Sequence, residues 1–79
     1  MIKLYTDTEK ELTFDDYKPL PSLRGLSLQA LYELQSNLEE AIDNAVIYHS
    51  ELLEMALDMD LRKIDMYVRM KQKKQEKKG

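Results

Sequence analysis

His49 is the only histidine of this 79-residue chain, and imidazole is the side chain that most readily exchanges a proton near neutral pH. Buried at a seam between subunits, it would make association depend on pH. A nucleophilic site would need a cysteine or a second histidine beside it, and the chain has neither. A partly exposed histidine that bonds to water or to Glu51 is the simpler explanation. We therefore predict no catalytic residue and no enzymatic activity.

The carboxylates of Asp58, Asp60 and Asp65 resemble the alternating oxygen ligands of a calcium loop. Such a loop also needs a glycine for its sharp turn and a bidentate glutamate at its end, and this stretch has neither. The sequence also contains no Glu-x-x-His pair of the di-iron type and no cysteine for a thiolate site. We expect no metal and no cofactor. The four-residue spacing instead predicts exposed helical ion pairs, Asp58 with Arg62 and Asp65 with Arg69.

A run of lysines closes the chain. Its members are Lys71, Lys73, Lys74, Lys77 and Lys78. These cations would contact the phosphates of a nucleic acid, or an acidic partner, through charge alone. They would also complement the dipole at the C-terminus of a helix, which is the simpler interpretation because no aromatic residue lies among them to stack on bases. Nucleic-acid binding by this segment is kept as the alternative function.

Charge is separated along the chain, although the net charge is only -3. Residues 26–60 contain eight carboxylates and no lysine or arginine, a charge of -8. Residues 61–79 contain eight basic and two acidic residues, a charge of +6. Parallel helices would bring like charges together along their length, whereas antiparallel helices would pair opposite charges. We therefore expect neighbouring helices to run antiparallel.

Residues 1–25 are expected to form a non-helical head and linker, because both prolines and the first of the two glycines lie there. Apolar and polar residues alternate at Ile2 and Leu4 and again at Leu12 and Phe14. This alternation predicts a short β-hairpin that packs on a helix. The Lys-Pro-Leu-Pro stretch that follows should be extended, since a residue before proline disfavours helical angles.

Residues 26–72 are predicted to form one long amphipathic helix, followed by a flexible basic tail at residues 73–79. Ser27 is a suitable N-cap, and Leu26 matches Leu31 as a hydrophobic staple across it. In a helical projection the polar residues keep to one strip along the whole segment. The apolar arc opposite is roughly 200° wide, much broader than the stripe of an ordinary surface helix.

The wide arc contains two seams, which implies two packing neighbours. The first seam follows the three-and-four spacing of heptad core positions and comprises Leu31, Leu34, Leu38, Ala41, Ala45, Tyr48, Leu52, Met55 and Met59. The second repeats at eleven residues and comprises Ile42, Val46, Leu53, Leu57, Ile64 and Val68. We expect a mainly α protein in which these residues form the interface of a homo-oligomer, a dimer or a tetramer, packed as a coiled coil or helical bundle.

A helical hairpin with its turn near residues 58–60 is the alternative. Aspartate disfavours helix and Asp60 interrupts the apolar arc, but no glycine or proline marks a turn there. A continuous helix from Leu28 to Met70 would be about 65 Å long, whereas a compact monomer of this size would be about 30 Å across. The continuous helix therefore requires an elongated oligomer, and a monomer would favour the hairpin.

Four methionines recur at helical spacing in the C-terminal half: Met55, Met59, Met66 and Met70. Methionine usually fills irregular gaps in a core, but it also forms adaptable binding surfaces. Both interpretations stand at this point. Met66 and Met70, with Tyr67 between them, are the first place to look for a partner surface.

In layout, the short head at residues 1–14, the helix from Ser27 and the lysine tail together resemble the small accessory proteins that tailed bacteriophages make early in infection. The resemblance implies a host-modulating or adapter role and identifies no target. Combined with the wide apolar arc, it leads us to expect a non-enzymatic oligomeric interaction protein, an adapter, inhibitor or regulator of another protein.

The first residues contain no apolar run of signal-peptide length, and no later segment approaches the roughly 20 apolar residues of a membrane span. The absence of cysteine suits a reducing compartment. We expect a cytoplasmic protein without membrane contact.

Overall fold

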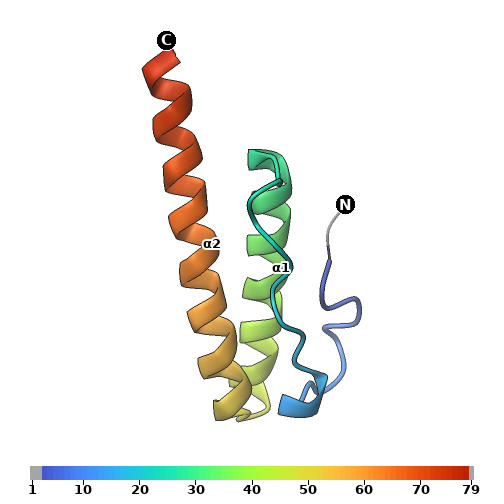
Figure 1. Cartoon of the computed structure of the whole chain (residues 1–79). Helices are drawn as coiled ribbons and strands as arrows, with labels where there is room; N and C mark the ends of the chain where they lie inside the picture. Colours follow the sequence, from blue (N-terminus) through green and yellow to red (C-terminus); the bar gives the residue numbers. More distant parts are fainter. Residues whose placement is uncertain (1–2, 79) are drawn as a thin grey trace.

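The computed structural model of the protein describes residues 3–78, except for the side chains of residues 74–78. Two long helices, α1 (Leu28–Ile47) and α2 (Glu51–Lys78), lie side by side and run in opposite directions (Figure 1). A 3-10 helix, η1 (Phe14–Asp16), lies near the turn that joins them. The molecule is a helical hairpin of 45 × 21 × 18 Å with an irregular N-terminal segment along one side.

α1 begins where the sequence predicts. The side-chain oxygen of Ser27 accepts a hydrogen bond of 3.1 Å from the backbone N–H of Ala30, so this N-cap is confirmed. One face of the helix is buried at the three-and-four spacing of a core-facing stripe. Its apolar members are Leu31, Leu34, Leu38, Ala41 and Ala45.

The chain reverses direction between α1 and α2. His49 has a φ of 60°, in the left-handed region. The backbone N–H of Ser50 donates to the carbonyl of Ala45 at 2.8 Å, and that of His49 donates to Val46 at 3.2 Å. These are the two hydrogen bonds of a Schellman motif, which satisfies the last carbonyls of a helix. α2 starts at once, since the N–H of Glu54 donates to the carbonyl of Ser50 at 2.9 Å.

The prediction of one helix over residues 26–72 is therefore wrong. The alternative turn near residues 58–60 is wrong too, because these residues lie inside α2. A left-handed helix cap is usually a glycine, and a histidine in its place gives no turn signal. α2 continues through Lys78, so the segment predicted as a flexible tail is helical as far as it is described, and Gly79 lies outside the described residues.

Closing the hairpin buries the apolar faces of the two helices against each other. α2 contributes Leu53, Leu57, Ile64 and Val68 to this core. Each large side chain buried in this way stabilises the fold by about 1.5–3 kcal/mol. Together with the five residues of α1, nine of the fifteen predicted interface residues thus meet within one chain. The prediction that both seams lie between subunits is wrong for these nine.

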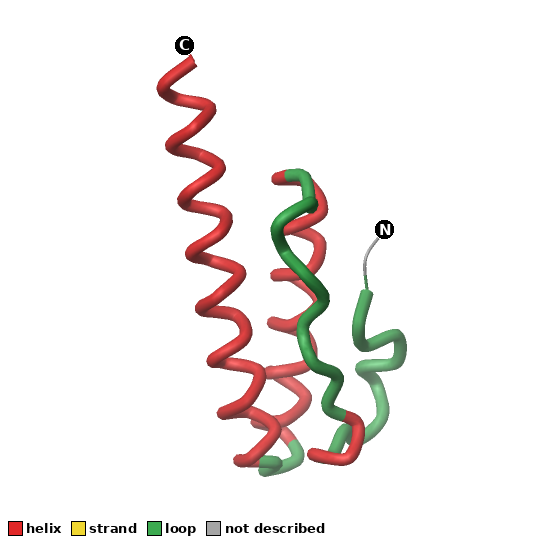
Figure 2. The backbone as a smooth tube through the Cα atoms, in the orientation of Figure 1, coloured by secondary structure: helices red, strands yellow, loops and turns green. Residues whose placement is uncertain are grey.

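The N-terminal head is not a β-hairpin, since the described part of the chain before α1 contains no strand (Figure 2). Residues 3–12, called the arm below, run along α1 toward the turn, and residues 17–27, the linker, return to the start of α1. Ile2, part of the predicted hairpin, lies outside the described residues. Three side chains of the arm and linker are buried in the core: Tyr5, Leu12 and Leu23.

Two buried asparagines of α1 hold the arm by its backbone. Asn37 Oδ1 accepts hydrogen bonds of 2.8 Å from the N–H groups of Leu4 and Tyr5. Asn37 Nδ2 donates to the carbonyl of Tyr5, also at 2.8 Å. Asn44, two turns further on, forms three such bonds of 2.7–3.0 Å with the backbone of residues 8–12. These six bonds take the place of a paired strand, which is why the arm needs none.

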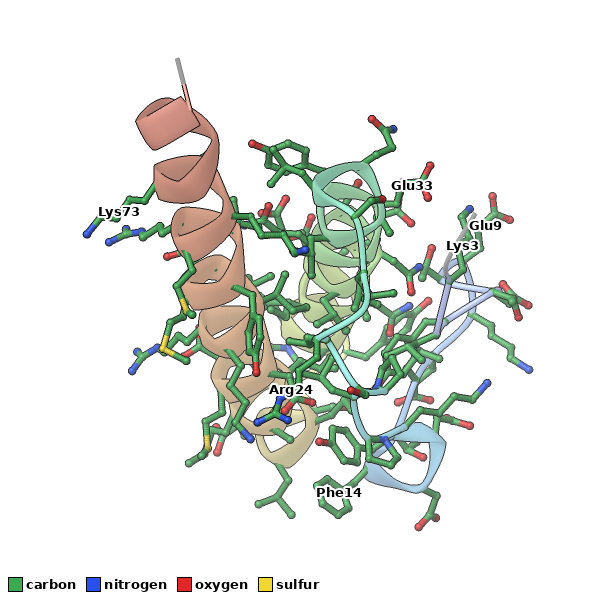
Figure 3. The ribbon with its side chains drawn as sticks, turned by 45° about the horizontal axis from the view of Figure 1, so that its top comes forward. Lys3, Glu9, Phe14, Arg24, Glu33 and Lys73 are labelled. Carbon is green, nitrogen blue, oxygen red and sulfur yellow. The ribbon has the colours of Figure 1, made fainter. Side chains whose placement is uncertain are left out.

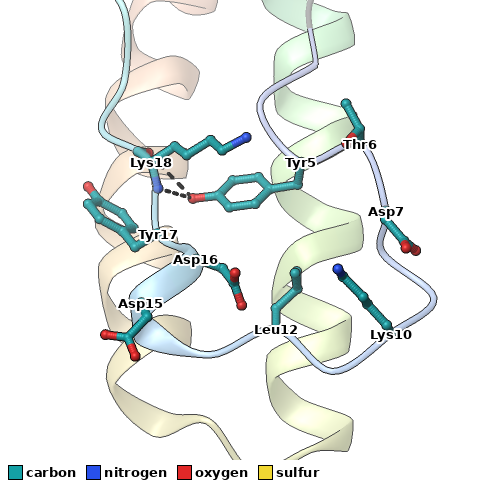
Figure 4. A pocket seen from close by; sticks show the side chains of 9 residues that line it. All are labelled: Tyr5, Thr6, Asp7, Lys10, Leu12, Asp15, Asp16, Tyr17 and Lys18. Carbon is teal, nitrogen blue, oxygen red and sulfur yellow. Dashed lines mark hydrogen bonds between the residues drawn. The ribbon is translucent and has the colours of Figure 1, made fainter.

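The ring of Tyr5 joins the arm to the linker (Figure 4). Its hydroxyl accepts a hydrogen bond of 3.0 Å from the backbone N–H of Lys18 and donates to the carbonyl of the same residue at 3.4 Å. Burial raises the pKa of the Tyr5 phenol above its ordinary value of 10.0, so the hydroxyl keeps the proton that it donates. One side chain thereby closes a loop over residues 5–18.

Replacing His49 with glycine distinguishes the hairpin from a continuous helix. A left-handed conformation costs a residue with a side chain about 1–2 kcal/mol. In the hairpin, His49→Gly should therefore leave stability unchanged or raise the free energy of unfolding by up to about 1 kcal/mol. In a continuous helix the same change would lower it by about 0.5–1 kcal/mol. Urea unfolding followed by circular dichroism measures the difference.

His49→Val is the matched control, because a β-branched residue tolerates the left-handed region least but fits a helix at small cost. The hairpin predicts that the glycine variant is more stable than the valine variant by about 1 kcal/mol or more. The reverse order would contradict the reversal at this residue.

Candidate interaction surfaces

The side of α2 that faces away from α1 carries a row of exposed apolar side chains. Isolated exposed apolar residues are common on proteins, but a row along one helix is typical of an interaction site. The members recur at intervals of three, four and seven residues, so they share one face of the helix. This row, called the methionine face below, comprises five residues that are 51–67% exposed: Leu52, Met55, Met59, Met66 and Met70.

Ion pairs follow one edge of the methionine face. Arg62 pairs with Asp58 at 3.2 Å, and Arg69 pairs with Asp65 at 3.0 Å. Both pairs predicted from the sequence are therefore confirmed. Because they are well exposed, each stabilises the helix by only about 0.3–0.5 kcal/mol. Their main effect is to give this edge of α2 a fixed pattern of charge.

At the turn end of the hairpin, three more apolar side chains reach solvent. Val46, Ile47 and Tyr48 are 50%, 69% and 42% exposed. A shallow groove of about 340 Å³ lies nearby between the helices and extends to the first methionine of the row. It is lined by Ile42, Glu51, Glu54, Met55 and Asp58. The apolar surface of α2 is therefore continued at the turn.

The fifteen residues predicted as an oligomer interface fall into three groups. Nine are buried in the hairpin core, and Ile42 is half-buried. The other five are exposed and lie on or near the methionine face: Val46, Tyr48, Leu52, Met55 and Met59. Met66 and Met70 are exposed as well, so the four methionines of α2 form surface and not core.

The basic segment at the end of α2 is only partly described. Lys71 is half-buried and Lys73 is exposed. The side chains of Lys74, Lys77 and Lys78 lie outside the described residues, so their predicted contacts with a partner or nucleic acid stay predictions.

The sequence pattern did not predict a structural role for three polar side chains that are buried. They are Asn37, Asn44 and Asp60, which are 2–6% exposed. A helical projection assigns Asn44 to the polar strip and gives Asn37 no role. The signal that could have revealed them is their seven-residue spacing, which places both amides on one face within the row of buried leucines and alanines. Amides buried on a core face need partners, and the arm supplies them.

Asp60 fastens the linker to α2. Its carboxylate Oδ2 accepts a hydrogen bond of 2.7 Å from the hydroxyl of Tyr17. This bond, together with burial and the negative charge of the carboxylate, raises the pKa of Tyr17 to about 12. A buried carboxylate is costly unless it is hydrogen-bonded. The interruption of the apolar arc at Asp60 therefore marks a tertiary contact and not a turn.

His49 is exposed in the turn and lies outside both helices, so within one chain it is not a buried histidine. Among the described residues, no group of three or more histidine, aspartate or glutamate side chains is arranged to hold a metal ion. Neither helix, over the same residues, is long and apolar enough to cross a membrane.

Comparisons of the chain with protein-family models, with curated proteins and with solved structures found no match.

Tyr17→Phe should lower the free energy of unfolding by about 1.5–3 kcal/mol at neutral pH, because a buried carboxylate loses its hydrogen bond. The pKa of Tyr17 is raised, so this contribution is fully present below the unfolded pKa of 10.0 and is lost as the pH rises through about 12. Urea unfolding of both proteins across this range should show the difference shrinking toward zero.

Tyr32→Phe is the matched control, since the hydroxyl of Tyr32 bonds to Gln72 at 2.7 Å on the exposed surface. Its loss should change stability by no more than about 0.5 kcal/mol. Equal effects of the two substitutions, or a Tyr17 effect that does not change with pH, would refute the role given to Asp60.

Proposed function

We propose that this chain is a non-enzymatic, cytoplasmic interaction protein that works as an antiparallel homodimer held by the methionine face. In this form it serves as an adapter, inhibitor or regulator of another protein. The observation that carries the proposal is the row of five large apolar side chains, each more than half exposed, on the side of α2 opposite the core. A second copy would cover the row with an identical one, and burial of apolar surface drives such association.

Charge along α2 favours a second copy in the antiparallel orientation. The same edge of the methionine face carries Glu51 and Asp58 near the start of the helix and Arg62 and Arg69 further on. In an antiparallel pair, Asp58 of one copy approaches Arg62 of the other, and Glu51 approaches Arg69. Each exposed pair contributes only about 0.2–1 kcal/mol. Several attractive pairs together can still decide between two orientations that bury a similar apolar area.

The composition of the face suits this contact. Methionine is unbranched and flexible, so it fills the gaps between two helix surfaces that are not perfectly complementary. Arg62 lies beside the gap in the row between Met59 and Met66, and the aliphatic stem of an arginine can cover apolar surface while its charge reaches water. Two copies of α2 therefore make a largely apolar contact along most of their length.

The adapter role has two supports. In a dimer held by α2, the arm, linker and α1 of each copy point outward, so the same surface is presented twice. The layout also resembles that of the small accessory proteins that tailed bacteriophages make early in infection, which favours a host-modulating role. A cytoplasmic location is consistent with a chain that contains no cysteine.

The first test is the oligomeric state. Sedimentation equilibrium at micromolar concentration should give twice the chain mass of 9.3 kDa. The double variant Met59→Glu, Met66→Glu should be monomeric, because it buries unpaired charges at the centre of the contact. Both positions are exposed in the hairpin, so circular dichroism of this variant should match that of the unchanged protein.

Glu40→Gln, on the exposed side of α1, is the control and should stay dimeric. A monomeric unchanged protein would overturn the homodimer, and a foreign helix would then be the candidate occupant of the methionine face. A dimer that survives the double variant would place the contact elsewhere.

Single cysteines at Met55 and Met66 test the orientation. The two positions lie about 17 Å apart along α2, and a disulfide needs Cα atoms within about 7 Å. In the antiparallel dimer, a mixture of the Met55→Cys and Met66→Cys variants should form the mixed disulfide in preference to either self-pair under mild oxidation. Efficient self-pairing at both positions would mean that the helices are parallel.

A further inference from the structure

A cleft runs between the linker and the flank of α2, away from the hairpin turn's apolar surface. It consists of two adjoining cavities of about 410 and 310 Å³ that share Arg24 and Tyr67 in their walls. Pro19 and Pro21 line the larger cavity on the linker side. Arg24, labelled in Figure 3, extends from the linker. Cavities of this size accommodate a small organic molecule or part of a larger one.

The floor of the cleft has a regular arrangement along α2. Lys63, Tyr67 and Lys71 line it at intervals of four residues, so they follow one flank of the helix and are about 6 Å apart along its axis. Tyr67 is half-buried and packs against the core, which holds its ring in place between the two lysines. An aromatic side chain therefore lies between two basic side chains on one flank of a helix.

The cations of this cleft are not used elsewhere in the described part of the chain. The neighbouring carboxylates Asp58 and Asp65 are paired with arginines on the other flank of α2. Asp60 lines the larger cavity, but its carboxylate accepts the hydrogen bond of Tyr17. Among the described residues, no carboxylate lies within 4.0 Å of the charged groups of Arg24, Lys63 or Lys71. On a chain of net charge -3, this is a local concentration of positive charge.

We propose that this cleft binds a nucleobase carrying phosphate, either as a free nucleotide or as a unit of single-stranded nucleic acid. The base stacks on the ring of Tyr67, and the phosphates contact Lys63, Lys71 and Arg24. Bases stack on aromatic rings without regard to sequence, and lysine and arginine bind the adjoining phosphates by charge. A duplex fits less well, because its bases are already stacked on one another.

The site shares Lys71 with the lysine run at the end of the chain, and its other residues lie outside that run. No aromatic residue lies among the lysines of that run, whereas in the cleft Tyr67 lies one helical turn from both Lys63 and Lys71, and folding of the linker adds Arg24. The cleft borders the methionine face, because Met70 lines its smaller cavity. All of its lining residues belong to one chain, so this inference does not require the proposed homodimer.

Fluorescence anisotropy of a 5′-labelled oligothymidine of eight nucleotides tests the proposal on the full chain. Binding should weaken as salt rises, and three phosphate contacts predict a slope of about -2 in a plot of log K against log salt. Tyr67→Ala should weaken binding by at least about fivefold, and Tyr67→Phe should restore it, since stacking needs the ring and not the hydroxyl.

Lys63→Gln and Lys71→Gln keep the test valid if the alanine variant unfolds, because they remove charge without removing a core side chain. Each should reduce the salt slope by about 0.7. Lys10→Gln, an equal change of charge on the exposed part of the arm, is the matched control and should leave the slope unchanged. If Lys10→Gln and Lys63→Gln reduced the salt slope equally, the binding would be non-specific electrostatic attraction and the proposed site would be refuted.

Unlabelled thymidine monophosphate distinguishes the two sources of the ligand. Displacement of the oligonucleotide by the mononucleotide would identify a nucleotide site. Binding of the oligonucleotide that the mononucleotide does not displace would identify a single-strand site. Absence of binding at 50 mM salt would refute the proposal, and it would leave the homodimer untouched.

Discussion

The reversal of the backbone at His49 decides which apolar surfaces of this chain meet. With helical angles at this residue, the leucines of α1 and those of α2 would point outward along one rod and would need other chains to cover them. With a left-handed residue and the two hydrogen bonds of the Schellman motif, the same side chains cover each other. The arm, the linker and the outward face of α2 all take their positions from this closure. Ser50 adds to it, since its hydroxyl donates to the carbonyl of Leu12 and ties the arm to the turn at 3.0 Å.

The buried polar groups then decide how the N-terminal segment is held. Asn37 and Asn44 interrupt the apolar face of α1, and Asp60 interrupts that of α2. Each would be costly to bury alone. Each instead bonds to a part of the segment that precedes α1: the asparagines to the arm and the aspartate to the linker. Polar residues on a core face therefore specify the path of a chain that has little regular structure of its own.

The sequence alone predicted part of this architecture. The Ser27 cap, the start of α1 and nine of the apolar side chains buried between Leu31 and Val68 follow from local chemistry and periodicity. What periodicity cannot give is the identity of the surface that covers them. The polar strip keeps its helical phase across the short turn, so the two helices look like one helix in the sequence. The periodicity therefore indicates which face of each helix is buried, but it does not reveal that the apolar faces of α1 and α2 bury each other. The turn itself was hidden because a histidine occupies the place of the usual glycine.

The candidate interaction surfaces were likewise only partly predictable from the sequence. The methionine spacing was visible in the sequence, but whether those residues were core or surface depended on where the leucines of α1 went. The cleft beside Tyr67 was beyond prediction, because Arg24 reaches it from a linker whose path is set by a hydrogen bond between residues 43 positions apart. The β-hairpin was predicted from alternation alone, which does not distinguish a strand from an extended chain held by side-chain amides.

The hydrogen bonds by which α1 holds the backbone of the arm have a consequence for how this protein can change over evolutionary time. A strand in a sheet constrains its residues through both backbone pairing and side-chain packing. Here the asparagine amides recognise only main-chain groups, which every residue except proline provides in full. Between the buried anchors Tyr5 and Leu12, the arm is therefore free to accumulate substitutions that alter its charge and chemistry while its course along α1 is preserved. A small protein built in this way can vary one stretch of its outer surface rapidly without rebuilding its core.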